Sequence, residues 1–404
     1  MGATQLSLPI EDSAPVFDEA AIRALRDDLL AEFGDPESGQ PADGKAAIRE
    51  RHRGQRASRW HRDIGRLRDN VPGLLANFAD GAEVDPYAIE PDLVAVEAGT
   101  PDADLFRLAT LLWSVPVSQG YGRRMRFLVR DRSNGKLVGL FALGDPVFNL
   151  RARDQWIGWS AADRRQRLVN VMDAFVVGAV PPYSSLLGGK LVFSLIASAE
   201  VGAAFAARYA DSAGVISGQR KAPRLALVTV TSALGRSSLY NRLRLTDPAD
   251  PSARLVDLVP IGWTRGYGHF QVSDGLFARM RTMLAAAEHP YASGHRFGDG
   301  PNWRMRVERV ALQQLGLSAD LQRHGIEREV FALPLASNAR EFLVGRDASA
   351  KLSRPTAAVI SEAALARWIR PRAARAPGYR SFRREDLLED LLRAGGPTLS
   401  VRET

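Results

Sequence analysis

Two short polar stretches of this sequence combine residues that can bind an anion and move a proton. The first, Pro181 to Lys190, places two serines, two adjacent glycines and a lysine between a β-like run and a helix pattern. Small residues let a backbone approach a ligand, and the N–H groups at a helix start attract a pyrophosphate. We therefore expect an anionic ligand at these residues: Ser184, Ser185, Leu187, Gly188, Gly189 and Lys190. The alternative is that the glycines only allow a helix to pack closely on a sheet.

The second stretch, Thr231 to Arg244, places several hydroxyl groups in a turn that follows another β-like run. A tyrosine in such a turn can act as a general acid, and a serine can orient a substrate. We expect Tyr240 to be the acid, and Ser232 and Ser238 to orient the substrate. The alternative is a short serine-capped helix whose tyrosine packs against its neighbours.

A third candidate is a strongly basic stretch, Lys45 to Arg68, which follows an acidic N-terminal region. The whole chain has a net charge of +8 and an isoelectric point near 10.0, which favours an anionic partner. Guanidinium groups bind phosphates in pairs of hydrogen bonds and release condensed counterions. We expect nucleic acid to contact the following arginines: Arg49, Arg53, Arg56, Arg59 and Arg62. The alternative is a solvated arginine-rich helix.

The composition excludes several other kinds of site. The chain has no cysteine, which excludes disulfides, thiolate nucleophiles and cysteine-based metal centres. The histidines show no spacing typical of a metal site, so we expect no bound metal. The N-terminus lacks the pattern of a signal peptide, and no apolar stretch reaches membrane-spanning length. We therefore expect a soluble, cytoplasmic protein without membrane contact.

The elements that must position these residues form an α/β pattern. At 404 residues the chain is long enough for two domains, or for one domain with helical additions. Residues 125–130 and 136–143 flank an Asn134–Gly135 turn and predict a β-hairpin. Further strands are expected at 174–180, 225–230, 255–262 and 267–272, and helices at 14–33, 45–70, 102–113, 186–209 and 302–315. Open α/β sheets bind ligands where strands end, which is where the two polar stretches lie.

Several of these segments together resemble a known family. They are Gly122–Val129, Asn134–Pro146, Trp156–Trp159, Asp173–Val176, Pro181–Lys190 and Thr231–Arg242. They look like the family of proteins of unknown function that includes DruA of the Druantia anti-phage systems, and the resemblance covers roughly residues 85 to 275. It implies a role in phage defence or another process linked to nucleic acid, with other defence-system proteins as partners.

A more distant resemblance concerns the reaction. The order of hairpin, strand, small-residue loop, helix, strand and tyrosine-bearing turn is similar to GCN5-related N-acetyltransferases, the GNAT fold, and to the phage Mom protein that modifies DNA adenine. It implies that Ser185 to Lys190 bind an acyl coenzyme A or another anionic donor and that Tyr240 is the acid. The sequence departs from the usual pattern of the loop, where Ser185 replaces an Arg or Gln and Lys190 replaces a small residue.

These observations lead to one expected architecture and two expected functions. We expect a mixed sheet flanked by helices, in an α/β (α+β) GNAT-like core over residues 85–275. A helical, arginine-rich extension would cover residues 1–84, and a mainly helical region residues 276–404. The first function is group transfer to an amine of a nucleobase or other substrate in phage defence. The alternative is a non-catalytic nucleic-acid-binding subunit of a defence or mobile-element complex.

Overall fold

The computed structural model describes residues 18–33, 45–67, 70–115, 117, 122–211, 222–266, 272–292, 301–323 and 325–394. Contacts divide the chain into two units, and each is described by itself below. The smaller contains residues 1–43 and 267–325, and the larger contains residues 44–266 and 326–404. The boundaries expected after residues 84 and 275 do not coincide with this division, because segments distant in the sequence pack together within each unit.

The larger unit is built on a seven-stranded sheet with the order β1-β2-β3-β4-β5-β9-β8. Neighbouring strands are antiparallel except β4 and β5, which are parallel. A separate two-stranded hairpin pairs β6 with β7. The strands are β1 (Pro91–Ala95), β2 (Arg124–Asp131), β3 (Lys136–Gly144), β4 (Val171–Ala179), β5 (Leu227–Thr231), β6 (Arg244–Thr246), β7 (Arg254–Asp257), β8 (Val259–Trp263) and β9 (Glu329–Pro334).

The hairpin of β2 and β3 shows why this sheet carries two layers of helices. Gly135 has a positive φ of 74° in the turn between the strands, which a glycine adopts without steric cost. Successive side chains of a strand point to opposite faces, so Phe127 contributes to one core and Leu128 to the other. All of β3 after Lys136 is buried, as expected for a central strand covered on both faces.

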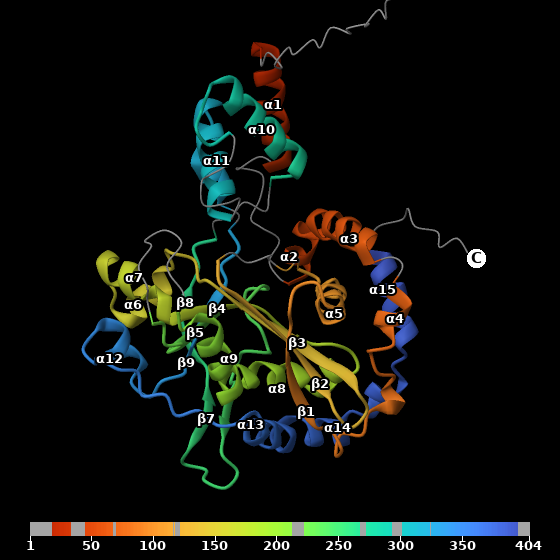
Figure 1. The fold of residues 1–404 in the computed structure, drawn as a ribbon. Helices are drawn as coiled ribbons and strands as arrows, with labels where there is room; N and C mark the ends of the chain where they lie inside the picture. Colours follow the sequence, from red (N-terminus) through yellow and green to blue (C-terminus); the bar gives the residue numbers. More distant parts are fainter. Residues whose placement is uncertain are drawn as a thin grey trace, which may run out of the picture. The chain divides into compact units, whose positions relative to one another are not determined.

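Helices cover both faces of the sheet (Figure 1). One core contains side chains of α8, α9 and α13, and the core on the opposite face contains side chains of α3, α5 and α15. The helices of the larger unit are α2 (Lys45–Arg51), α3 (Arg53–Leu67), α4 (Val71–Leu75), α5 (Pro101–Thr110), α6 (Arg151–Ile157), α7 (Ala161–Arg167), α8 (Gly188–Ser194), α9 (Ala199–Tyr209), α12 (Ala339–Val344), α13 (Ala357–Ala364), α14 (Arg370–Arg375) and α15 (Arg384–Ala394).

The smaller unit contains α1 (Glu19–Phe33), α10 (Asp274–Ala286) and α11 (Pro301–Gln314). Its core combines Leu25 and Leu29 of α1 with Met280 of α10 and Val307 of α11, all fully buried. The Arg26 side chain donates a hydrogen bond of 2.9 Å to the carbonyl of Leu315. The N-terminal helix α1 therefore packs against α10 and α11. An ion pair between Asp28 of α1 and Arg279 of α10, which are 251 residues apart in the sequence, also joins them.

The structure confirms the predicted mixed α/β sheet flanked by helices, with local differences. The helix expected over 45–70 is interrupted at His52, and that over 186–209 is interrupted at Ser198, which caps α9. The run expected over 255–262 forms parts of β7 and β8, whereas 267–271 lie outside the described residues. Within the described ranges no single helix has the length and apolar composition of a membrane span, although one pair bent by 52°, 188–197 and 199–209, meets that test jointly.

Candidate functional site

The parallel strands β4 and β5 separate soon after they pair. Their register contains three residue pairs and ends at Asp173 opposite Thr229, although β4 continues to Ala179. On its other side, β4 changes register against β3 between the pairs Leu143–Ala174 and Ala142–Val176, so that Phe175 is an extra residue. A bulge of this kind bends a strand, which explains why β4 leaves β5 there. We call the place where this pairing ends the opening between β4 and β5; it is a break in the strand pairing, and Val177, Val230 and Tyr240 near it are buried.

Asp173 lies at the edge of this opening. Its carboxylate accepts a hydrogen bond of 2.8 Å from the Thr229 hydroxyl. Burial raises the pKa of Asp173 to about 6, although the Thr229 hydrogen bond and the Arg153 charge act in the opposite direction. Arg153 is fully buried and forms an ion pair with Asp154, with an N–O distance of 2.7 Å. Asp173 is therefore a carboxylic acid that can exchange a proton near neutral pH.

Tyr240 follows β5 and is buried in the main core. Its ring centre lies 5.5 Å from that of Phe193 in α8 and 5.6 Å from that of Phe331 in β9. Burial raises the pKa of the Tyr240 hydroxyl, and the nearby Asp173 charge raises it further. The predicted acid and the carboxyl group at the opening are thus close enough to interact electrostatically.

The two predicted serines differ in their surroundings. Ser232 is fully buried directly after β5, and its hydroxyl has no hydrogen-bond partner in the described part of the chain. Its backbone N–H donates a hydrogen bond of 2.9 Å to Glu329 in β9. Ser238 is exposed in the turn before Tyr240. Ser232 is therefore buried at the end of β5, and Ser238 lies at the surface.

The predicted donor loop forms a 3-10 turn, Tyr183–Leu186, before α8. Ser184, Ser185 and Leu187 are exposed there. The two glycines are closely packed: a Cβ on Gly188 would lie 2.6 Å from a backbone oxygen, and one on Gly189 would lie 2.9 Å from a side-chain carbon of the following turn. The two glycines therefore allow close packing around the start of α8, which is the alternative role that the sequence offered for them.

Lys190 connects the donor loop to the turn that carries Tyr240. Its ammonium group donates hydrogen bonds to the carbonyls of Leu239 and Asn241, at 3.0 and 3.1 Å. Burial lowers the pKa of Lys190, and the charge of Arg367 lowers it further. The ammonium group therefore already has two acceptors, and the backbone N–H groups of Ser184, Ser185 and Leu187 also donate to nearby carbonyls.

The predicted arginine stripe does not lie on one face. Arg49, Arg53 and Arg62 are exposed, whereas Arg56 and Arg59 are partly buried. Arg59 forms an ion pair with Asp63 at 3.2 Å, and its side chain is 17% exposed. It also donates a hydrogen bond of 3.4 Å to Thr110 of α5. The exposed arginines are available to a polyanion, and Arg59 holds α3 on α5.

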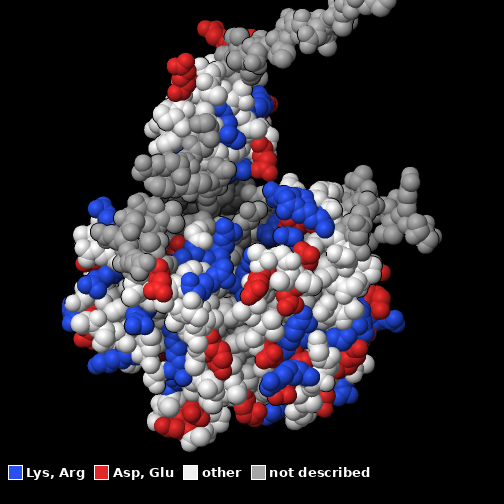
Figure 2. All heavy atoms as spheres, in the orientation of Figure 1, with Lys and Arg blue, Asp and Glu red and all other residues white. Residues whose placement is uncertain are grey.

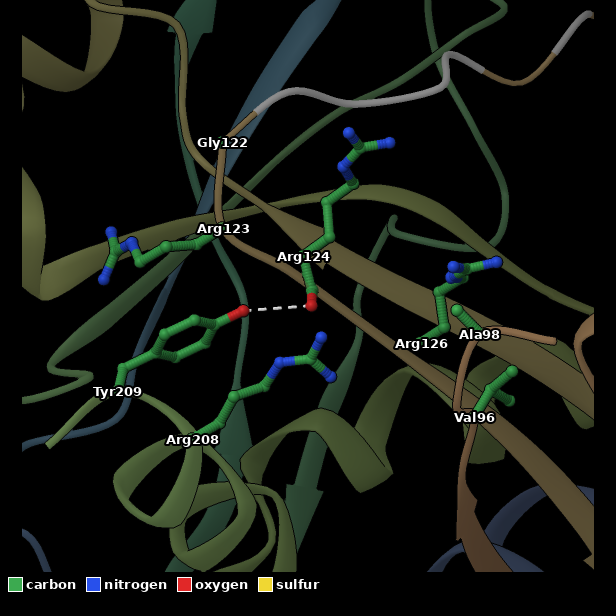
Figure 3. A pocket seen from close by; sticks show the side chains of 8 residues that line it. All are labelled: Val96, Ala98, Gly122, Arg123, Arg124, Arg126, Arg208 and Tyr209. Carbon is green, nitrogen blue, oxygen red and sulfur yellow. Dashed lines mark hydrogen bonds between the residues drawn. The ribbon is translucent and has the colours of Figure 1, made fainter. Parts of the chain in front are cut away.

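A pocket of about 290 Å³ lies beside the start of β2 and contains four arginines. Its lining residues are Val96, Ala98, Gly122, Arg123, Arg124, Arg126, Arg208 and Tyr209. Figure 3 shows Arg208 reaching from the end of α9 toward the β2 arginines, while Arg123 turns away. The Tyr209 hydroxyl donates a hydrogen bond of 2.9 Å to the carbonyl of Arg124. Because no lining residue is acidic, this pocket suits an anion.

Sequence reasoning missed both Asp173, whose pKa is raised by burial, and the arginine pocket. A single carboxylate in the apolar run Val171–Ala179 was the signal for Asp173. The Arg123–Arg124 pair before β2 was a weak signal for the pocket, since Arg208 comes from a distant helix. In the described ranges, no group of three or more His, Cys, Asp or Glu side chains could hold a metal ion.

Comparisons with known proteins point to one family. The family model described as Druantia protein DruA matches residues 42–345. A relative named Druantia protein DruA, from Escherichia coli (strain UMEA 4076-1), is 47% identical over 350 residues, which cover 86% of this chain and 85% of the relative. No solved structure matches the chain significantly.

Proposed function

Since the chain belongs to the Druantia protein DruA family, we propose that it serves in anti-phage defence by acting on nucleic acid. The reaction is group transfer to an amine, such as that of a nucleobase, and the opening between β4 and β5 is the reaction site. Other proteins of the defence system are its partners. The exposed arginines of α2 and α3 support a nucleic-acid substrate.

The observation that carries the proposal is the separation of β4 from β5 at Asp173. An amine loses a proton when it gains an acyl group, and a carboxylate with a pKa of about 6 is suited to accept it near neutral pH. The Tyr240 hydroxyl keeps its proton because burial and Asp173 raise its pKa, so it can donate to a departing group. Acid and base are thus provided by two neighbouring side chains of different pKa.

An anionic donor, such as an acyl coenzyme A, would supply the group that is transferred. The exposed residues Ser184, Ser185 and Leu187 would hold it, since Lys190 is bonded to carbonyl oxygens. Ser238, which is exposed near Tyr240, would contact the acceptor, and the buried Ser232 would support the strand end. Fixing both reactants at one opening accounts for much of the rate gain in such reactions.

Transfer to an oligonucleotide tests the proposal. The purified protein is incubated with acetyl coenzyme A and an oligonucleotide that contains all four bases, and digested nucleosides are weighed by mass spectrometry. We expect an acetyl adduct with the wild type and none with Tyr240→Phe or Asp173→Asn, while both variants keep wild-type affinity for the oligonucleotide. Equal adduct formation by all three proteins would show that the reaction does not use this opening.

The second candidate function is a non-catalytic nucleic-acid-binding subunit. The contacts of Lys190 and the close packing of Gly188 and Gly189 favour it, because these features fill part of the predicted donor loop. The same assay separates the two functions. A wild type that binds the oligonucleotide but transfers nothing from any acyl donor, with Tyr240→Phe equally protective against phage, would favour the binding subunit.

A further inference from the structure

The arginine pocket gathers positive charge from β2 and α9. The Arg123 guanidinium is held by the protein, since it lies 2.7 Å from Asp145 and also donates to the carbonyls of Val169 and Val171. Among the described residues, neither Arg126 nor Arg208 has a carboxylate at ion-pair distance. Arg126 and Arg208 therefore provide the charge of the pocket that is open to a ligand.

The positive charge of Arg126 is destabilised by its burial and by its arginine neighbours. It is half-buried, and its guanidinium lies 5.9 Å from the ring centre of Phe106. Burial lowers the pKa of Arg126, and the charges of Arg124, Arg107 and Arg208 lower it further. Like charges gathered in a partly buried site repel one another, and a bound anion would remove that repulsion.

The pocket is also rigidly built. Gly122 has a positive φ of 64°, and a Cβ on it would lie 2.1 Å from Oδ2 of Asp145. That oxygen accepts a hydrogen bond of 2.9 Å from the Arg123 backbone. Only glycine at position 122 leaves room for the carboxylate that holds Arg123, so the local sequence preserves the geometry of the pocket.

We propose that Arg126 and Arg208 form a binding site for a phosphate group of a nucleic-acid strand. Guanidinium groups provide paired N–H donors that match phosphate oxygens, and a volume of about 290 Å³ leaves room for a phosphate with part of its sugar. This inference rests on the proposed function, for which it names a binding surface.

The surrounding charges continue the path of a strand beyond the pocket. Arg107 of α5 acts electrostatically on Arg126 and also on Arg59 of α3, and Arg62 acts on Arg59. Figure 2 shows Lys and Arg side chains in the middle of this face of the larger unit and again over α2 and α3. A strand whose phosphate occupies the pocket can therefore continue toward the exposed arginines of α3.

The pocket is linked to the reaction site through the start of β4. The Arg123 guanidinium donates a hydrogen bond of 3.2 Å to the carbonyl of Val171, two residues before Asp173. Arg123 therefore contacts both the pocket and the strand that carries Asp173.

Binding of a fluorescent single-stranded oligonucleotide at several salt concentrations tests this site. Each phosphate contact to a single strand contributes about 0.7 to the slope of log affinity against log salt. For Arg126→Gln with Arg208→Gln we expect the slope to fall by about 1.4, which weakens binding about 25-fold at 0.1 M salt. The control Arg165→Gln with Arg375→Gln removes the same charge from exposed positions outside the pocket and should leave the slope unchanged.

Four further results decide the interpretation. Arg208→Gln alone changes an exposed side chain, so it should fold normally and lower the slope by about 0.7. If AMP or inorganic phosphate displaced the strand at an equal phosphate concentration, the assignment to a strand would be overturned. An unchanged slope in the pocket variants, with acetyl transfer intact, would overturn the pocket alone, whereas a wild type that binds no strand would also overturn the proposed function.

Discussion

Replacing Asp173 by asparagine should make the protein more stable at high pH while it removes the proposed base. Burial raises the pKa of Asp173 from its ordinary value of 3.8 to about 6. The folded state therefore holds this proton more tightly than the unfolded state does, and the free energy of unfolding falls as the pH rises between these two values. The gap corresponds to about 3 kcal/mol, fully lost above about pH 6.

Asparagine cannot ionise, and its amide oxygen can still accept the Thr229 hydrogen bond. We expect Asp173→Asn to exceed the wild type by up to about 3 kcal/mol at pH 8 and by about half as much at pH 5. Urea unfolding followed by tryptophan fluorescence measures this difference. Six of the seven tryptophans lie in the larger unit, which also contains Asp173, and only Trp303 lies in the smaller unit, so the signal reports mainly on the larger unit. A pH-independent difference, or a variant less stable than the wild type at pH 8, would refute the reasoning.

Three further predictions follow from individual contacts. Ser232→Ala should leave the free energy of unfolding unchanged or raise it by about 1 kcal/mol in urea titrations, because the buried hydroxyl has no partner in the described ranges. A loss above about 1 kcal/mol would contradict this, since it would mean that the hydroxyl makes a stabilising interaction. Arg59→Gln should lower the free energy of unfolding by about 1–3 kcal/mol, because it removes a partly buried ion pair. Arg62→Gln should change the free energy of unfolding by less than about 0.5 kcal/mol and weaken only nucleic-acid binding. Equal costs for the two variants would contradict the partly buried position of Arg59 and the exposed position of Arg62. Gly122→Ala should lower the free energy of unfolding by about 1–3 kcal/mol through backbone strain alone, as measured by urea unfolding. It should also weaken binding of the oligonucleotide, as measured by fluorescence anisotropy. A variant with unchanged stability and binding would contradict this prediction and would mean that Asp145 can move.

Local signals predicted the sheet well. The Asn134–Gly135 turn and the apolar runs on either side specify β2 and β3 through contacts between residues close in the sequence. The strand β9 was missed, because its place between β5 and β8 depends on pairing with segments far away in the chain. The GNAT-like character of the core stays a prediction.

The candidate site was harder to predict than the sheet. Tyr240 and the loop before α8 were predicted as site residues because their residue types stand at strand ends, and their roles stay predictions. The raised pKa of Asp173 depends on its burial by segments far away in the chain, and its hydrogen-bond partner Thr229 is 56 residues away, so no local pattern could show either. Similarly, the charge of Lys45–Arg68 was visible in the sequence, but the inward position of Arg59 depends on how α3 packs against α5.

Protection of cells against phage provides the most direct test of the reaction site. Cells carrying this chain with the other proteins of its defence system are challenged with a phage that the wild-type system restricts, and the efficiency of plating is measured. We predict that Asp173→Asn abolishes protection although the variant accumulates to at least the wild-type level. Full protection by that variant would contradict the proposal that the opening between β4 and β5 is where this protein acts.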